Sequence, residues 1–342
     1  MKVLVLATSR KTRGGVTAVI NMYRQSPMWT QFNCRWIETH RDGGVLVKVA
    51  YLVKALLQYA VCLPFYDIVH IHIGLIPSAK RKYIFWRLAK MLKKKTVIHL
   101  HCGSQIEEIW TRVYRIMFEQ SDCAIVLSSS IKRIIEQHTG PSDRIRVVYN
   151  PCPEVCIKDG PKDNILLFSG TVCEAKGYKD LIRAFSKVAA KHTDWKLVLA
   201  GNGEIAQAHG LAEELGVADK VVIPGWVRGE DKDRLFSCAG AFCLPSYAEG
   251  LPMAVLEAFA YGLPVITTPV GAIPDIADNG QNVLLFDCGD VDELANSIEK
   301  VISDRVLRER LADNGRKLAT TVFSLETVSN QIAGIYFLLS DE

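Results

Sequence analysis

The chain has 342 residues, of which 49% are hydrophobic and 23% are charged. This composition is that of a globular protein with packed cores, and it excludes a disordered or low-complexity chain. Because 342 residues are too many for one ordinary hydrophobic core, we expect two domains of roughly 150–170 residues each.

The net charge of +4 conceals a difference between the two halves of the chain. Residues 1–160 carry 24 Lys and Arg against 11 Asp and Glu, whereas residues 161–342 carry 17 against 26. A strongly basic half suggests an anionic partner, such as nucleic acid, lipid head groups or a phosphorylated substrate. The ten cysteines form no CxxC pair and no His/Cys cluster at metal-ligand spacing, so we interpret them as small apolar residues in a reducing cytosol.

The first half of the chain alternates short apolar, β-branched runs with helical patterns such as Val16–Arg24 and Lys80–Leu92. Strands that are apolar on both faces and separated by helices predict a parallel sheet between helix layers. The N-terminal run MKVLVLATSR is too short for a secretory signal and is interpreted as the first buried strand. The strands predicted in this half are Lys2–Ala7, Ile68–Ile73, Thr96–Leu100, Cys123–Leu127 and Ile145–Tyr149.

The segment Val45–Phe65 is apolar enough to raise the question of a membrane span. Lys48 and Lys54 interrupt it, and a spanning helix needs about 20 mostly apolar residues. We therefore expect that it does not span a membrane. The pattern predicts a helix with a few lysines that is either packed against the protein or interfacial.

A stretch with three prolines and no periodicity, Asn150–Asp163, is interpreted as a linker, after which the strand–helix alternation resumes. The sequence predicts an α/β protein of two Rossmann-like, doubly wound parallel-sheet domains that face a cleft. The domains are expected at residues 1–155 and 156–324, with a C-terminal helix at 325–342 that packs back on the first. In such sheets, ligands bind outside the carboxyl ends of the strands. The elements predicted in the second half are strands Ile165–Phe168, Lys196–Ala200, Val221–Ile223, Gly240–Leu244, Val265–Thr268 and Val283–Phe286, and helices Tyr178–Lys191, Glu204–Leu215, Glu230–Ser237, Pro252–Tyr261, Val291–Ser303 and Arg305–Thr320.

The segment Pro245–Ile276 combines a strand end, a loop with Glu249 and Gly250, and a helix with Pro252 in its first turn. The backbone N–H groups at a helix start favour an anion, and a diphosphate suits this position. Glu249 is placed to accept hydrogen bonds from sugar hydroxyls, and Glu257 from a ribose diol. Because the neighbours of Glu257 are apolar, we expect this carboxylate to be partly buried and to need a partner.

This stretch and the run GLPVITTPVGAIPDI within it resemble the Glu-x7-Glu motif of the retaining glycosyltransferase family 4, which has the GT-B fold. Phe168–Tyr178 resembles the first strand and loop of the family, Ala200–Glu204 its second glycine turn, and Pro224–Val227 the loop that holds the nucleotide base. The resemblance implies a nucleotide-sugar donor, which we expect to be a UDP-sugar. The residues that it assigns to donor binding are Gly14, Gly15, Gly170, Thr171, Lys176, Gly201, Gly203, Trp226, Val227, Glu249, Gly250, Leu251, Pro252, Met253, Ala254 and Glu257.

The match in the first half is looser. Arg13–Val16 resembles the glycine loop after the first strand, Asp67–His72 a strand of the cleft, and His99–Gly103 the segment that supplies a histidine to it. Neither the GxGxxG nor the P-loop pattern appears. The catalytic residues that the resemblance implies are Glu249, His101 and Lys176.

Lys176 is a cation placed to stabilise the charge that grows on the leaving diphosphate as the glycosidic bond breaks. In relatives an Arg also stands just after the Gly of the first loop, where this chain has Thr171. The candidates to replace that cation are Arg13, Arg10 and Arg228, in that order, and the alternative is that all three are surface arginines.

The resemblance further implies retention of the anomeric configuration and a reaction without a metal or other cofactor. We find no DxD motif of the kind that holds a divalent metal on the diphosphate, so the helix dipole and Lys176 are expected to stabilise it. No side chain is marked as a covalent nucleophile. In the mechanism attributed to relatives, the departing phosphate oxygen takes the proton of the incoming hydroxyl, while Glu249 and His101 contact the sugar.

The acceptor side shows a basic, aromatic-rich helix, which is typical of a membrane-surface contact or of an ordinary solvated helix. We favour peripheral attachment to an anionic inner leaflet of the cell membrane, a cytoplasmic location and a lipid-linked or saccharide acceptor. Nucleic acid is the rival partner, but no nucleic-acid-binding motif accompanies the charge, so we expect none. The basic residues of this helix and its exit are Lys80, Arg81, Lys82, Arg87, Lys90, Lys93, Lys94 and Lys95.

Two alternatives to the transferase remain open at this stage. One is a nucleotide-sugar epimerase on the same architecture, because fold alone does not fix function. The other is a nucleotide-sugar-binding subunit without turnover, which the replacement of the family arginine by Thr171 favours.

Overall fold

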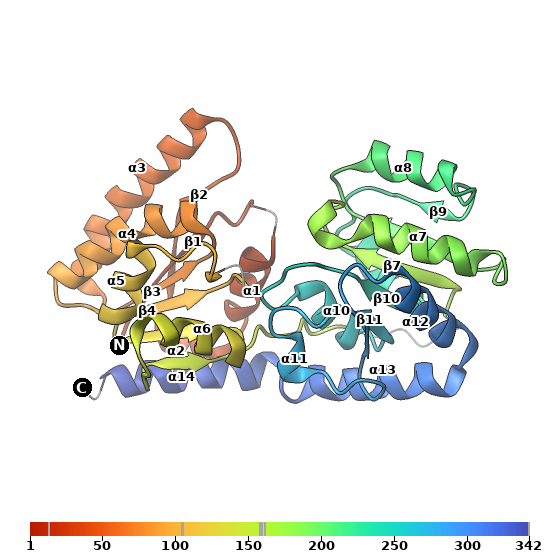
Figure 1. Cartoon of the computed structure of the whole chain (residues 1–342). Helices are drawn as coiled ribbons and strands as arrows, with labels where there is room; N and C mark the ends of the chain where they lie inside the picture. Colours follow the sequence, from red (N-terminus) through yellow and green to blue (C-terminus); the bar gives the residue numbers. More distant parts are fainter. Residues whose placement is uncertain (13, 104–105, 157–159, 161, 341–342) are drawn as a thin grey trace. The chain divides into compact units, whose positions relative to one another are not determined.

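The computed structural model of the chain describes residues 1–12, 14–103, 106–156, 160 and 162–340. It forms two compact units, one of Met1–Pro151 with Leu325–Glu342 and the other of Cys152–Ser324 (Figure 1). The sequence placed the first boundary between residues 155 and 156. The structure places it four residues earlier, because the backbone N–H of Cys152 donates to the carbonyl of Phe323 at 2.7 Å and ties Cys152 to the second unit.

The first unit contains a six-stranded sheet in the order β2-β1-β3-β4-β5-β6, in which every neighbouring pair is parallel. All six residues of β3 are buried, as expected for a strand covered by helices on both faces. The strands are β1 (Val3–Thr8), β2 (Arg35–His40), β3 (Ile68–Ile73), β4 (Lys95–Leu100), β5 (Cys123–Val126) and β6 (Ile145–Val147).

The helices of the first unit include one from the end of the chain. Tyr336 of this last helix packs edge-on against Phe32, with ring centroids 5.1 Å apart, and its hydroxyl lies 2.5 Å from Nδ1 of His70 in β3. The chain therefore completes the core of its first unit with its last helix. The helices are α1 (Gly15–Tyr23), α2 (Pro27–Gln31), α3 (Val45–Cys62), α4 (Ile76–Met91), α5 (Arg112–Gln120), α6 (Ser129–Thr139) and α14 (Leu325–Ser340), with a 3₁₀ turn, η1, at Leu63–Phe65.

The second unit contains another parallel six-stranded sheet, in the order β12-β11-β10-β7-β8-β9. Its strands are β7 (Ile165–Ser169), β8 (Lys196–Ala200), β9 (Val221–Val222), β10 (Ala241–Leu244), β11 (Val265–Thr267) and β12 (Leu284–Leu285). Its helices are α7 (Tyr178–Ala189), α8 (Ile205–Glu214), α9 (Glu230–Cys238), α10 (Met253–Ala260), α11 (Ile273–Ile276), α12 (Val291–Ser303) and α13 (Arg305–Thr320), with a 3₁₀ turn, η3, at Glu174–Lys176. The predicted fold class, two doubly wound parallel sheets, is confirmed.

Three details differ from the sequence prediction. Strand β2 was not predicted, because it lies at the edge of its sheet and alternates buried with partly exposed residues. Helix α4 begins one turn earlier than Lys80, with Pro77 in its first turn. Helix α10 begins at Met253, and Pro252 is its N-cap residue with extended backbone angles, so the proline precedes the helix instead of lying in its first turn.

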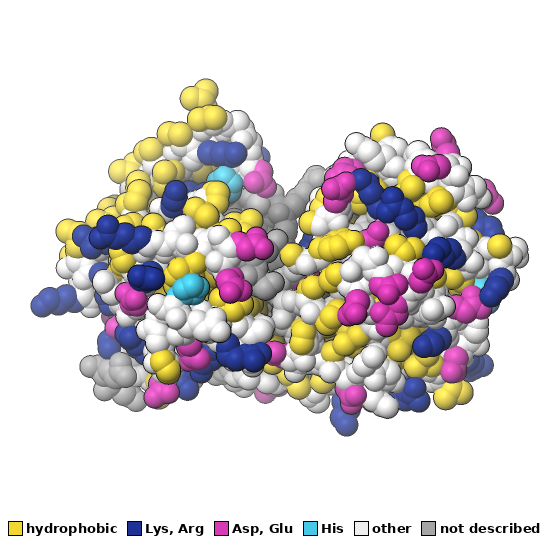
Figure 2. All heavy atoms as spheres, in the orientation of Figure 1, with side chains coloured by type: hydrophobic (Ala, Val, Ile, Leu, Met, Phe, Trp, Pro, Cys, Tyr) yellow, Lys and Arg dark blue, Asp and Glu magenta, His cyan; other side chains and the backbone are white. Residues whose placement is uncertain are grey.

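Two helical segments, Val45–Phe65 and Arg305–Ser340, are long and apolar enough to cross a membrane by length and composition alone. Half of the second is buried inside the protein, which is typical of core helices, whereas only 17% of the first is buried. The absence of a membrane span in Val45–Phe65 stays a prediction. Its apolar outer surface is visible over α3 in Figure 2.

Candidate active site

The N-terminus of α10 is the centre of the candidate site. A backbone hydrogen bond fixes the loop between β10 and α10: the N–H of Ala272 donates to the carbonyl of Gly250 at 2.7 Å. The amides of Met253 and Ala254 have no hydrogen-bond acceptor in the part of the chain that the structure describes. These two amides and the helix dipole form a site for an anion.

Glu249 lies in this loop and is mostly buried, with its side chain 12% exposed. Its Oε1 forms an ion pair with Nζ of Lys176, the last residue of η3, and accepts a hydrogen bond from the Ser246 hydroxyl at 2.9 Å. The two side chains that the sequence assigned to the sugar and to the diphosphate are therefore in contact with each other. A ligand at this position has to share or replace this ion pair.

Glu257 also forms an ion pair. Its side chain is 14% exposed, and its Oε1 lies 2.6 Å from Nζ of Lys232 in α9. Burial raises the pKa of Glu257, and the charge and hydrogen bond of Lys232 oppose this shift. The expectation of a partly buried carboxylate with a partner is confirmed. Sequence reasoning missed Lys232, since no local pattern connects a residue of α9 to one of α10.

The glycine turns after β7 and β8 are packed directly against each other. A Cβ on Gly201 would lie 1.7 Å from the carbonyl oxygen of Gly170, and one on Gly203 would lie 2.2 Å from that of Val172. Gly203 also has a φ of +138°, which other residues rarely adopt. These positions therefore require glycine for the backbones to approach, and they shape the loops at the carboxyl ends of the two strands.

The loop after β9 is held by the second of these turns. The Asn202 side-chain oxygen accepts a hydrogen bond from the backbone N–H of Trp226 at 3.1 Å. The Trp226 side chain is 40% exposed, and the neighbouring Val227 is partly buried. An aromatic ring presented by a fixed backbone provides a surface on which a nucleobase can stack.

The arginines that were predicted to replace the missing family arginine lie in different surroundings. Arg10 forms an ion pair with Glu38 at 3.1 Å and lies over the Trp36 ring. Arg228 is exposed, and so is Thr171. Arg13 lies outside the described residues. Arg10 is thus already paired with a carboxylate, so a phosphate that binds it has to displace Glu38.

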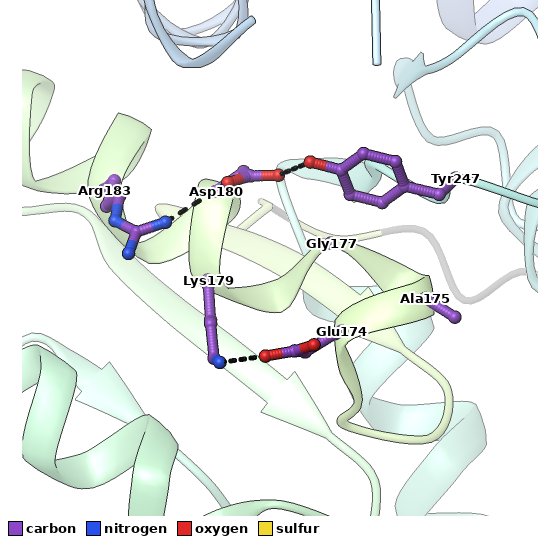
Figure 3. Close-up of a pocket in the computed structure, with 7 residues that line it drawn as sticks. All are labelled: Glu174, Ala175, Gly177, Lys179, Asp180, Arg183 and Tyr247. Carbon is purple, nitrogen blue, oxygen red and sulfur yellow. Dashed lines mark hydrogen bonds and ion pairs between the residues drawn. The ribbon is translucent and has the colours of Figure 1, made fainter. Parts of the chain in front are cut away.

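A pocket lies beside the Lys176–Glu249 pair, around the start of α7, and Figure 3 shows its lining. The polar groups drawn there already bind one another: Tyr247 donates to Asp180 at 2.5 Å, Arg183 lies 3.4 Å from the same carboxylate, and Lys179 pairs with Glu174. Sequence reasoning did not identify this pocket. Because none of the residues that the resemblance assigns to donor binding lines it, we do not place the reacting groups there.

Two Asp-x-Asp triplets occur in the second unit, Asp231–Asp233 and Asp290–Asp292, so the sequence does contain this spacing. Both serve the fold. Asp233 accepts a hydrogen bond from the Tyr261 hydroxyl at 2.7 Å, and Asp290 caps α12 by accepting from the N–H of Glu293 at 2.8 Å.

In the first unit, the predicted histidine His101 follows the carboxyl end of β4. Its Nε2 lies 2.8 Å from Nδ1 of His72, the fifth residue of β3. Burial lowers the pKa of His101 to about 3, so the ring is neutral. Gly14 and Gly15 stand at the start of α1, where Gly14 has a φ of +140° and a Cβ would meet no atom within 4 Å.

Comparisons with known proteins agree with this architecture. The family model described as "Glycosyl transferases group 1" matches residues 157–318, and the one described as "Glycosyltransferase Family 4" matches residues 31–153. An N-acetyl-alpha-D-glucosaminyl L-malate synthase of Bacillus anthracis is 26% identical over 79% of this chain and 74% of its own. The lipopolysaccharide core biosynthesis glycosyltransferase LpsE of Rhizobium meliloti is 30% identical over 62% of this chain and 63% of its own.

Among solved structures, HepE of Anabaena in complex with UDP has a TM-score of 0.80 at 20% identity, covering 99% of this chain and 100% of that one. The two parallel-sheet units and these matches define a glycosyltransferase of the GT-B type. The chain belongs to glycosyltransferase family 4.

Proposed function

We propose that this enzyme is a retaining, metal-independent glycosyltransferase that moves a sugar from a UDP-sugar to a hydroxyl of a saccharide or lipid-linked acceptor in surface polysaccharide or glycolipid synthesis. One observation carries the proposal. Two largely buried carboxylates, Glu249 and Glu257, are each paired with a lysine near the N-terminus of α10, where two amides have no acceptor among the described residues.

The donor replaces protein partners with its own groups. Its diphosphate binds the amides of Met253 and Ala254 and takes Lys176 from Glu249, which leaves that carboxylate to accept hydrogen bonds from the sugar hydroxyls. The ribose diol in the same way competes with Lys232 for Glu257. Each carboxylate keeps hydrogen-bond donors throughout this exchange, so neither is left buried without a partner.

The base stacks on Trp226, whose backbone is fixed by Asn202. The UDP in the HepE structure supports uridine as the base. The glycine turns around Gly170 and Gly201 pack directly on each other and fix the loops that border the donor.

In the reaction, the bond between the anomeric carbon and the phosphate oxygen breaks, and a bond forms from that carbon to the acceptor oxygen on the same face. The acceptor proton passes to the departing phosphate oxygen. Lys176 and the α10 N-terminus stabilise the charge that develops on this oxygen. Glu249 and the neutral ring of His101 position the sugar.

We further propose a cytoplasmic enzyme attached peripherally to the inner face of the cell membrane, with no nucleic-acid partner. The excess of Lys and Arg in residues 1–160 supports an anionic surface as a partner. The name of LpsE, a lipopolysaccharide core enzyme, supports a lipid-linked saccharide as the acceptor.

Incubating the purified chain with a panel of nucleotide-sugars and acceptors tests the proposal. We expect UDP release only with a UDP-sugar, an unchanged anomeric configuration in the product by NMR, and full activity in EDTA. An inverted product or complete loss of activity in EDTA contradicts the mechanism. Interconversion of the donor without an acceptor would indicate an epimerase, and donor binding without release of UDP a subunit without turnover.

A further inference from the structure

The outer surface of α3 is apolar and largely uncovered by the rest of the protein. Every described residue from Asp42 to Ala50 is exposed, and the apolar side chains continue outward on one face to the end of the helix. We call this face the α3 stripe, and Figure 2 shows it over α3. The α3 stripe consists of Leu46, Val49, Val53, Leu57, Val61 and Phe65.

Steps of three or four residues place these side chains in one row along a helix. They are exposed to water to a degree that is rare for large apolar residues: Leu46 is 86% exposed and Phe65 is 70% exposed. A continuous apolar row of this kind marks a surface that a partner covers.

On the opposite side of α3, only residues in the second half of the helix are buried against the protein. Ala55 and Tyr59 are fully buried, and the Tyr59 hydroxyl donates to the carbonyl of Phe85 in α4 at 2.9 Å. The Tyr59 and Phe85 rings meet edge-on at 5.2 Å. The helix is therefore fixed at one end and presents the stripe along its whole length.

The charges around the stripe identify the partner. Neither α3 nor α4 contains an acidic residue, α3 carries Lys48 and Lys54, and the exposed apolar residues Ile84 and Met91 of α4 stand among lysines and arginines. Apolar side chains flanked by cations match the interface of an anionic bilayer, where acyl chains lie below negative head groups.

We infer that α3 lies in the plane of an anionic membrane, with the α3 stripe inserted among the acyl chains and Lys48 at the head groups. A spanning orientation would strip Tyr59 and Ala55 from their buried positions against the protein. The inference rests on the proposed membrane attachment and names the element that produces it.

Co-sedimentation of the full chain with lipid vesicles tests this inference without any transfer reaction. The vesicles consist of phosphatidylcholine alone or of phosphatidylcholine with about 30% anionic phosphatidylglycerol. Binding is expected only to the anionic vesicles. Leu46→Glu with Leu57→Glu is expected to reduce binding at least about tenfold, because each change removes an apolar anchor and adds repulsion. Val306→Glu, at an equally exposed position on α13, is the matched control and should bind as the parent does.

A tryptophan at position 46 gives a second readout that does not depend on loss of binding. In Leu46→Trp, the additional fluorescence is expected to shift to the blue with vesicles and to be quenched by brominated lipids. Equal vesicle binding by parent and double variant overturns the inference, as does a parent that forms a dimer through the stripe and ignores lipid. If vesicles bind normally but no donor is turned over, the proposed function fails and this inference stands.

A second observation, independent of the first, concerns the histidines of the first unit. His70 and His72 of β3, His99 of β4 and His101 stack on one another, with ring centroids 4.3–5.3 Å apart. Three of them, His70, His72 and His99, are close enough to suggest a metal site. However, stacked rings aim their in-plane lone pairs side by side, and both nitrogens of His70 already face Tyr336 and His99. The stack is therefore organised by hydrogen bonds.

The geometry points to His72 as a positioning residue for His101. The 2.8 Å contact between Nδ1 of His72 and Nε2 of His101 holds the His101 ring and leaves its Nδ1 as the nitrogen that meets substrate. The position of His72 is itself fixed, since Lys82 of α4 donates to its carbonyl oxygen. This inference rests on the proposed contact between His101 and the sugar.

Substitutions at position 72 separate a positioning role from a packing role. His72→Leu removes the hydrogen bond and is expected to lower kcat about 10- to 100-fold, as loss of the partner of a functional histidine does. His72→Asn places an amide where Nδ1 was and should restore most of the activity. His70→Leu, on the same strand and equally buried, is the matched control, because the hydrogen bonds of His70 go to Tyr336 and His99 and not to His101.

Nitrogen NMR of His101 supplies a readout that packing does not affect. In the parent the ring should occupy one neutral tautomer, and in His72→Leu a mixture of two. If His72→Leu keeps the parent tautomer and kcat, the positioning role is wrong. If His101→Ala itself keeps full activity, the proposed contact with the sugar fails instead, and a tautomer change in His72→Leu still identifies the hydrogen bond.

Discussion

The two units share a parallel-sheet architecture but manage polar groups at their strand ends in opposite ways. In the second unit, buried charge is kept in pairs of opposite sign, Lys176 with Glu249 and Lys232 with Glu257. In the first unit, β3, β4 and the residue after β4 carry four neutral imidazoles. The neighbouring buried Lys82, whose pKa burial lowers to about 7, forms no ion pair with any described residue.

The two units can therefore treat a ligand differently. Paired charges exchange partners, so the second unit can accept a charged ligand without leaving a buried ion alone. Neutral imidazoles act through the direction of their hydrogen bonds, so the first unit depends on orientation more than on charge.

The strongest test removes one charge from a pair. Glu249→Gln keeps the shape of the side chain and is expected to lower kcat by about 10²–10³, because the amide neither accepts from the sugar as strongly nor balances Lys176. Initial rates of UDP release measure the effect. Glu174→Gln, which changes the exposed partner of Lys179 nearby, is the control and should leave the rate unchanged. Equal losses in the two variants would contradict a special role for the Lys176–Glu249 pair.

The second test concerns the backbone that supports the pairs. Gly201→Ala would place a Cβ 1.7 Å from the carbonyl oxygen of Gly170, so one of the two turns has to move. We expect a loss of roughly 2–4 kcal/mol in the free energy of unfolding and weaker donor binding. Urea denaturation and a thermal shift with UDP measure the two effects. Gly210→Ala, in open space on α8, should be neutral or slightly stabilising.

The third test measures how acid changes the stability of the first unit through its buried histidines. Burial lowers the pKa of His70 to about 3, below the value of about 6.5 for an unfolded chain. Above about pH 6.5 both states are neutral and His70 contributes no pH dependence. As pH falls from there towards 3, only the unfolded state takes up the proton, so stability falls by about 1.4 kcal/mol per pH unit for each such histidine.

Hydrogen exchange of the β3 and β4 amides between pH 7 and 5 measures this loss, after correction for the intrinsic exchange rate. His70→Asn should make protection less sensitive to pH, whereas His209→Asn, an exposed histidine of α8, should not. Equal pH sensitivity of protection in the parent and in His70→Asn would show that the burial of His70 in its neutral form does not cause the loss of stability in acid.

The smallest effect is expected at Asn202. Asn202→Ala removes the acceptor for the Trp226 N–H, so the loop that presents the ring loses one hydrogen bond of about 1 kcal/mol. The KM for the donor should rise about threefold to tenfold with kcat nearly unchanged. Asn164→Ala, at an exposed hydrogen bond to Asp194, is the control. A fall in kcat without a change in KM would place Asn202 in the chemical step instead.

Much of the second unit was predictable, because its site is built from contiguous sequence. Glu249, the α10 start and Glu257 lie within nine residues of one another, so a loop and the helix that follows it bring them to one site. The glycine turns are equally local. Lys232 was not predictable, since its contact with Glu257 spans 25 residues and arises from the packing of α9 near α10.

The first unit was harder to predict for the same physical reason. The sequence marked His101 by resemblance, but its contact with His72 lies across the β3–β4 ladder, 29 residues away, and depends on strand register. Lys82 was counted with the basic surface of its helix, whereas it is buried and points to the carbonyl of His72. Rotation about the helix axis, not composition, separates it from Lys80 and Arg87.

Because α14 belongs to the first unit, that unit cannot complete its core until the end of the chain has been synthesised. Tyr336 supplies the partner of His70 and packs on Phe32, yet it is synthesised only after every residue of the second unit. At about 5–20 residues per second, that delay is on the order of ten to thirty seconds. During this time, the apolar surface of the first unit that α14 later covers stays exposed. We therefore expect the nascent chain to need chaperones for its first unit longer than for its second.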